Sequence, residues 1–381
     1  MAVLLAACSH SEDGGEQTFD GPTVMTFYVY SPESPALTRA NTGYVEAEQA
    51  ERRVSTLQIW VFKSGSGELV GYLSPNETDQ QTLNTTGNAE LQMIVGQAFG
   101  HSPENVDVYV LANFTLENSG LAFDASTTRA ELETAMMGQT GSMGGNSDAF
   151  GLSDLTTSVP TDGLPMSGVL RNQPVVGEAP ILRIGSVGEL STVKLVRMVS
   201  KIRFVFSRAS DSEETVEIRG IELNGGLIPT DEYVFLEGDY DERSSHVSNS
   251  YVMGNYALMQ GVITDEEMGK PDEPDRYVYL SHQSQVYEDL INDGVESGEL
   301  TERGPFYLRE SDKQLTGTIS YALNGGETKQ ATFRLSEAGD FSRNHTWIVY
   351  AHYGTATMEV VTVEVLDWTQ RNSDPRVIYN W

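Results

Sequence analysis

Short apolar or alternating runs, each about the length of a β-strand, recur along this 381-residue chain and indicate an all-β fold. The run 57–62 is largely apolar on both faces, which is typical of a central strand, and the turn Ser64-Gly65-Ser66-Gly67 leads into the run 69–73. Further strand-length runs cover 24–30, 89–95, 106–112, 181–186, 191–207, 215–223, 251–259, 276–281, 315–323, 331–335, 346–353 and 358–368.

One segment carries clear helix signals. Thr128 stands at a cap position, Glu131 completes a capping box, and Gly138 predicts the end of the helix. Helix-length periodic segments are otherwise few and glycine is abundant, with 36 residues, so we expect minor helices only.

The chain is long enough for two ordinary cores. The segment Gly185-Ser186-Val187-Gly188 predicts a boundary near 187–192, between an N-terminal domain over 40–188 and a C-terminal domain over 189–381. The run 191–207 alternates apolar and basic residues, and we interpret it as a long half-exposed strand whose cations Lys194, Lys201 and Arg203 offset neighbouring carboxylates.

The charge of the chain limits its partners. Its 24 basic and 55 acidic residues give a net charge of −31, and such a surface repels nucleic acid and anionic lipid headgroups. No apolar run is long enough to span a bilayer, so membrane attachment is expected only through a covalent lipid.

A site for such a lipid stands near the N-terminus. Leu5-Ala6-Ala7-Cys8 resembles a bacterial lipobox, and Cys8 is the only cysteine, so no disulfide holds the fold. Residues 1–8 are interpreted as the remnant of a lipoprotein signal whose basic and apolar regions lie upstream of an internal start. The alternative is a chance cysteine in a frayed terminus.

Catalytic and metal-binding patterns are missing from the sequence. It contains no nucleophile elbow and no zinc-protease motif, and His345 and His352 would face opposite sides of one strand. The acidic stretches 239–242 and 272–275 lack the periodicity of a calcium loop and are interpreted as solvated loops. We therefore predict no enzyme activity, no cofactor and no metal.

Several pieces together resemble one family, the fimbrillins of Bacteroidales, which are subunits of type V pili. The similar pieces are the strand Leu57–Phe62, Pro165-Met166-Ser167-Gly168, the strand Leu195–Ile202, Arg343-Asn344-His345-Thr346-Trp347, and the ending Val363-Glu364-Val365-Leu366-Asp367-Trp368. The resemblance covers nearly the whole chain. It implies two tandem Greek-key, transthyretin-like β-sandwich domains and a structural or adhesive role in a fimbrium at the outer membrane and cell surface.

The resemblance also implies a route of assembly. Residues 9–39 would be a propeptide that includes a removable strand at 24–30, cut after Arg39 to leave Ala40 as the new N-terminus, with Arg52 or Arg53 as the alternative site. Subunits would then join head to tail by strand exchange.

Two C-terminal segments could donate the exchanged strand. One is the face formed by Val361, Val363 and Val365, and the other is the alternating set Val377, Tyr379 and Trp381. The first is equally what a buried core strand of the second domain would look like.

Other functions stay open at this point. The chain could be a lipid-retained pilus anchor, or a surface lipoprotein that never polymerises and binds glycans through Trp60, Trp347 or Trp381. The partners expected are other copies or related subunits, with host or bacterial surface ligands as a further possibility. A stalk, tip or anchor position is not distinguished.

Overall fold

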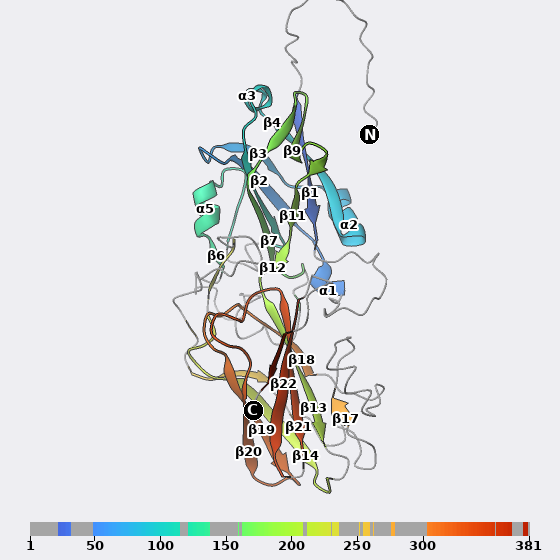
Figure 1. Cartoon of the computed structure of the whole chain (residues 1–381), viewed down its shortest axis with the longest axis vertical. Coiled ribbons are helices and arrows are strands. Elements are labelled where there is room, and N and C mark those ends of the chain that lie inside the picture. Colours follow the sequence, from blue (N-terminus) through green and yellow to red (C-terminus); the bar gives the residue numbers. More distant parts are fainter. Residues whose placement is uncertain are drawn as a thin grey trace, which may run out of the picture.

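The computed structural model describes residues 22–31, 49–114, 121–137, 159, 162–208, 212–229, 231–235, 251, 254–259, 262, 276–278, 303–354, 356–367 and 376–379. These residues form two β-sandwich domains that follow one another along the long axis of the molecule (Figure 1). The predicted all-β fold class is confirmed.

The N-terminal domain consists of two sheets. The six strands of its first sheet are β1 (Thr23–Tyr30), β4 (Asn88–Val95), β8 (Val175–Glu178), β9 (Ile181–Ser186), β10 (Glu189–Leu190) and β11 (Thr192–Lys194). The five strands of its second sheet are β12 (Val196–Arg197), β7 (Met166–Gln173), β5 (Val106–Ala112), β2 (Leu57–Lys63) and β3 (Leu69–Leu73), in that spatial order.

Alternation of apolar and polar residues fixes which face of each strand is buried. In β4, Leu91 and Met93 enter the core between the sheets while Glu90 and Gln92 are exposed. β2 is buried on both faces between β3 and β5, as its apolar pattern predicts. Its second face is covered because residues 121–137 fold over the outer side of the sheet.

The C-terminal domain is a second sandwich. One sheet contains β13 (Ser200–Arg208), β17 (Arg276–Val278), β18 (Arg303–Leu308), β21 (His345–Tyr353), β22 (Met358–Asp367) and β23 (Arg376–Tyr379). The other contains β14 (Val216–Leu223), β16 (Tyr256–Met259), β19 (Thr316–Leu323) and β20 (Thr328–Arg334). Phe204 and Phe333 meet edge to face across the sandwich, with ring centroids 5.6 Å apart.

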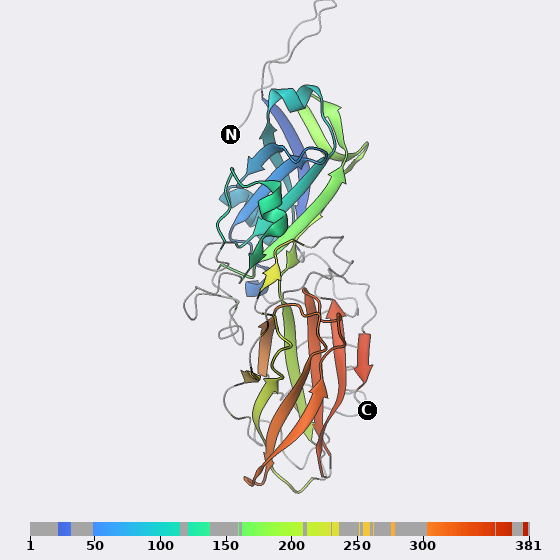
Figure 2. The same cartoon turned by 90° about the vertical axis from the view of Figure 1, so that its left-hand side faces the viewer.

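A short ribbon joins the two domains. β6 (Met136–Met137) pairs antiparallel with β15 (Glu232–Tyr233) where the domains meet (Figure 1). Beside this ribbon the rings of Tyr109 and Phe235 lie edge to face with centroids 5.1 Å apart. The sandwiches therefore share buried apolar contacts, and the turned view in Figure 2 shows them end to end.

The helices are short. Among the described residues they are α1 (Gln49–Arg52), α2 (Glu77–Thr86), α3 (Gln97–His101) and α5 (Arg129–Thr134). The capping box predicted for Thr128 and Glu131 is present, but α5 ends before the predicted stop because Met136 and Met137 pair with β15. None of the helices among the described residues is long and apolar enough to cross a bilayer.

The run 191–207 differs from its prediction. It forms three strands, β11, β12 and β13, of which the first two pair with β1 and β7 of the N-terminal domain. Residues 189–197, which we assigned to the second domain, therefore pair within the first. The expected half-exposed face is wrong at Lys201 and Arg203, since both side chains are buried, while Lys194 is exposed.

Candidate functional site

β1 is an interior strand of the first sheet of the N-terminal domain. All eight of its residues pair antiparallel with β4, from Thr23 opposite Val95 to Tyr30 opposite Asn88. On its other edge it runs parallel to β9 and then to β11. β1 is therefore hydrogen-bonded along both edges.

The two faces of β1 have different surroundings. Met25, Phe27 and Val29 point into the core and have no exposed surface. Thr26 and Tyr28 lie on the opposite face. Removing β1 would leave unpaired backbone groups on three strands beside an apolar slot with three side-chain positions.

The outer face of β1 forms part of a groove of about 880 Å³ between β4 and the β8–β10 region. Tyr28 and Glu90 line it, and the Tyr28 hydroxyl donates a hydrogen bond of 3.1 Å to Glu90 Oε2. The hydrogen bond and the negative charge of Glu90 raise the pKa of Tyr28. Because β1 supplies Thr26 and Tyr28, replacing this strand would change the chemistry of the groove.

A buried charged cluster around Glu51 ties α1 to the C-terminal domain. The Glu51 carboxylate has no exposed surface and accepts hydrogen bonds from Lys201 Nζ at 2.8 and 2.9 Å and from the Tyr307 hydroxyl at 2.6 Å. Arg197 Nε donates to the Glu51 carbonyl at 3.1 Å, and Arg197 Nη1 to Asn344 Oδ1 at 3.3 Å. α1 lies where the two domains meet (Figure 1).

The electrostatics of Glu51 follow from this geometry. Burial alone raises the pKa of its carboxyl, but the positive charge of Lys201 and the hydrogen bonds from Lys201 and Tyr307 outweigh that effect. The pKa of Glu51 therefore lies below its ordinary value, and the carboxylate is ionised at neutral pH.

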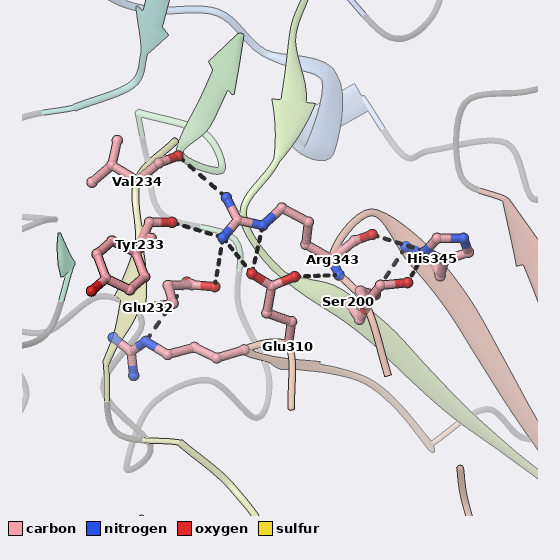
Figure 3. Close-up of polar contacts among 9 residues, drawn as sticks. Ser200, Glu232, Tyr233, Val234, Glu310, Arg343 and His345 are labelled. Atoms are coloured by element: carbon pink, nitrogen blue, oxygen red, sulfur yellow. Dashed lines mark hydrogen bonds and ion pairs between the residues drawn. The ribbon is translucent and has the colours of Figure 1, made fainter. Parts of the chain in front are cut away.

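A second buried cluster surrounds Arg343 (Figure 3). Its guanidinium contacts Glu310 Oε1 at 2.6 Å and donates to the carbonyl oxygens of Tyr233 and Val234 at 2.7 and 3.3 Å. These carbonyls belong to β15 and the residue after it, so Arg343 fixes the ribbon that joins the domains.

The predicted site residues are distributed as follows. Cys8, Arg39, Ala40 and Trp381 lie outside the described residues. Val377 and Tyr379 belong to β23, and Val361, Val363 and Val365 to β22. β22 pairs with β21 from Met358 to Asp367 and with β23 on its other edge, and both Val363 and Val365 are buried in the C-terminal core.

The suggestion that Trp60 and Trp347 bind glycans is wrong. Trp60 and Trp347 are fully buried, and Trp60 Nε1 donates to the Asp124 carbonyl at 2.8 Å. They are core residues and offer no surface on which a sugar could stack.

Sequence reasoning did not identify Glu51 as a functional residue. It stands in a polar segment directly before Arg52 and Arg53, and its partners are up to 256 residues away. Only the proximity to that arginine pair could have drawn attention to it.

The inner face of β1 can be tested by substitution. Phe27→Ala should lower the free energy of unfolding of the N-terminal domain by about 3–5 kcal/mol, because it leaves a cavity in the core. Tyr28→Ala, the matched change on the outer face, should lower the same free energy of unfolding by no more than about 1 kcal/mol. Urea unfolding followed by circular dichroism measures both, and equal losses would contradict the assignment of the faces.

The ion pair of Glu51 predicts a pH dependence. Since the pKa of Glu51 is lower in the folded protein than in the unfolded chain, its contribution is complete above the unfolded pKa of about 4.3 and is lost as pH falls through the folded pKa. Glu51→Gln should flatten the acid side of the stability curve, and at neutral pH it should lower the free energy of unfolding by about 3–5 kcal/mol because the buried charge of Lys201 is no longer offset by this carboxylate.

Urea midpoints measured from pH 7 down to pH 2.5 test this prediction. The control is Glu104→Gln, whose side chain is half exposed and 3.5 Å from Lys63, and which should change stability by less than about 1 kcal/mol. Parallel curves for the wild type and Glu51→Gln would show that Glu51 does not contribute to the acid transition.

The N-terminal domain is similar in sequence to a known protein family. Residues 24–187 match the family model described as major fimbrial subunit protein (FimA). A search of curated proteins finds no match.

Solved structures share the fold over most of the chain. A candidate cell adhesion protein of Parabacteroides distasonis is 13% identical, with a TM-score of 0.50 and coverage of 93% of this chain and 95% of that chain. Another of Bacteroides eggerthii is also 13% identical, with a TM-score of 0.50 and coverage of 93% and 98%. The tip fimbrial protein Mfa3 of Porphyromonas gingivalis aligns over 91% and 100% at 13% identity, with a TM-score of 0.49.

These identities are low, so the structural matches speak for the fold, and the sequence evidence comes from the family model. The family model begins inside β1 and ends in the turn after β9, so it includes the central strand described above. The resemblance to the fimbrillin family is thereby confirmed by sequence over residues 24–187, and over most of the chain the solved structures show a shared fold.

Proposed function

We propose that this protein is a subunit of a cell-surface type V pilus, exported as a lipoprotein precursor, cleaved after Arg39 and assembled by donor-strand exchange. The observation that carries the proposal is the position of β1. It occupies the middle of the first sheet, yet its link to β2 runs through the segment that contains Arg39. The chain has no Lys or Arg before Arg39.

Cleavage at Arg39 would turn β1 into a separate peptide held only by non-covalent contacts. Its departure would open the slot now filled by Met25, Phe27 and Val29. A strand from another copy could fill that slot if it ran antiparallel to β4 and carried apolar side chains at alternate positions. Because each copy would receive one strand and donate another, the association would continue into a filament.

The contacts of β22 and β23 support the C-terminal tail as the donor. Withdrawing β22 would break its long ladder with β21 and remove Val363 and Val365 from the C-terminal core. β23 has four residues and, among the described strands, pairs with β22 alone. Val377, Tyr379 and Trp381 have the same spacing of two residues as Met25, Phe27 and Val29.

The lipid would hold the precursor at the outer membrane until processing. Cys8 precedes β1, so cleavage after Arg39 followed by the departure of β1 would release the subunit from its anchor. We predict acylation of Cys8 when the full upstream signal is present. Metabolic labelling with a palmitate analogue should mark the wild type and leave Cys8→Ala unlabelled, and equal labelling of both would place the lipid elsewhere.

Deleting Arg371–Trp381 should abolish polymers while both domains stay folded, because the deletion spares β22. A milder test is Tyr379→Asp, which puts a charge at an inward position of the proposed donor strand, with Asn380→Asp as its outward control. Electron microscopy of protease-treated protein measures filaments, and circular dichroism checks the fold.

Normal filaments from the deletion variant would exclude the tail as donor. A mature surface protein that keeps β1 and an acylated Cys8 would instead support the anchor role.

A further inference from the structure

Before β2 the sequence contains three bonds that an arginine-specific protease could cut, those after Arg39, Arg52 and Arg53. All three lie between β1 and β2, so each would detach β1. If the proposed processing occurs, the bonds after Arg52 and Arg53 compete with the bond after Arg39. Arg52 and Arg53 lie among the described residues, and their surroundings can be examined directly.

The backbone that follows Arg53 is fixed by two asparagine side chains. Asn113 Nδ2 donates to the Arg53 carbonyl at 2.7 Å, and Asn113 Oδ1 accepts from the Ser55 amide at 2.8 Å. Asn84 bonds both the amide and the carbonyl of Val54, at 2.7 and 2.8 Å. The peptide groups that a protease would have to bind in extended form are thus already engaged.

Asn113 is itself held firmly. Its side chain is fully buried, its backbone adopts φ 61°, and its Nδ2 also donates to the Leu164 carbonyl at 2.8 Å. Gly163 lies so close that a Cβ there would come within 2.5 Å of the Arg53 carbonyl oxygen. The segment cannot be lifted out without disturbing this packing.

On the other side of the arginine pair stands Glu51. Its carboxylate accepts hydrogen bonds from Lys201 of β13 and Tyr307 of β18, both in the C-terminal domain. Its backbone carbonyl accepts one from Arg197 of β12, the last strand of the N-terminal domain. A protease acting after Arg52 or Arg53 would have to pull Glu51 out of this pocket and so remove the carboxylate that offsets the buried charge of Lys201.

We propose that the Glu51 cluster is a protease-resistance device that closes the bonds after Arg52 and Arg53 and thereby restricts arginine-specific processing to the bond upstream of α1. The processed chain keeps Glu51, and with it the polar contacts that join the two domains. Cleavage at Arg52 or Arg53 would remove the carboxylate and weaken that junction.

Digestion of the purified full chain with an arginine-specific protease, with new N-termini identified by mass spectrometry, tests the inference. The wild type should yield Ala40 as the first new N-terminus. In Glu51→Gln, cleavage after Arg52 or Arg53 should become more than about 100-fold faster, because cleavage follows the population of the open segment. Tyr307→Phe, which removes one hydrogen bond and no charge, should give a smaller increase of about tenfold.

Glu104→Gln is the matched control and should leave the rates after Arg52 and Arg53 unchanged. The inference is overturned if the wild type is cut there as fast as after Arg39, or if Tyr307→Phe is cut no faster than the control. It is also overturned if, in the variants, the bonds after Arg129 and Arg171 are cleaved as fast as the bond after Arg53, since the whole fold and not the Glu51 cluster would then provide the protection. None of these readouts needs filaments, so an absence of polymers would count against strand exchange alone.

Discussion

The N-terminal domain depends on β1, whose backbone is hydrogen-bonded to other strands along both edges. A strand at the rim of a sheet can leave at the cost of one ladder, but β1 carries an antiparallel ladder with β4 and parallel ones with β9 and β11. Without it the first sheet separates into β4, the group β8–β10, and β11, and the core loses Phe27 and its neighbours. A substitute strand must therefore reproduce direction, length and alternation together.

The junction between the domains depends on charges that are expensive to bury singly. The side chains of Glu51 and Lys201 have no exposed surface, and Arg343 is enclosed with Glu310 and the Tyr233 carbonyl oxygen of β15. Each charge is tolerated only while its partners stay in place, so these clusters fix where the domains sit relative to each other. The apolar contact of Tyr109 with Phe235 adds area to the same junction.

Local patterns in the sequence predicted much of the fold. β4, β14 and β19 alternate clearly, β2 is apolar on both faces, and the capping box of α5 is complete. α2 escaped prediction because only Leu83 among its residues is buried, which leaves no apolar period to detect.

The failures of prediction have a different cause. Arg197 and Lys201 stand in a run that alternates apolar and basic residues, a pattern typical of a strand with one face in solvent. Both are buried, because they contact Asn344 and Glu51, each about 150 residues away in the sequence. The location of β1, Arg39 and the tail could be inferred as a candidate assembly site, whereas Glu51 could not, because its role exists only through contacts made by distant segments. A lone carboxylate in a polar stretch carries no such information.

The pairing of β1 with β11 also has a consequence for the order of folding. Tyr28 lies opposite Thr192, so the first strand of the chain waits for residues more than 160 positions later before one of its edges can close. Contacts of such high sequence separation form late because loop closure must precede them. During synthesis β1 can pair with β4 once residue 95 has emerged, whereas its other edge stays open until β9 and β11 have been made, so for that interval the edge that they close presents unpaired backbone groups.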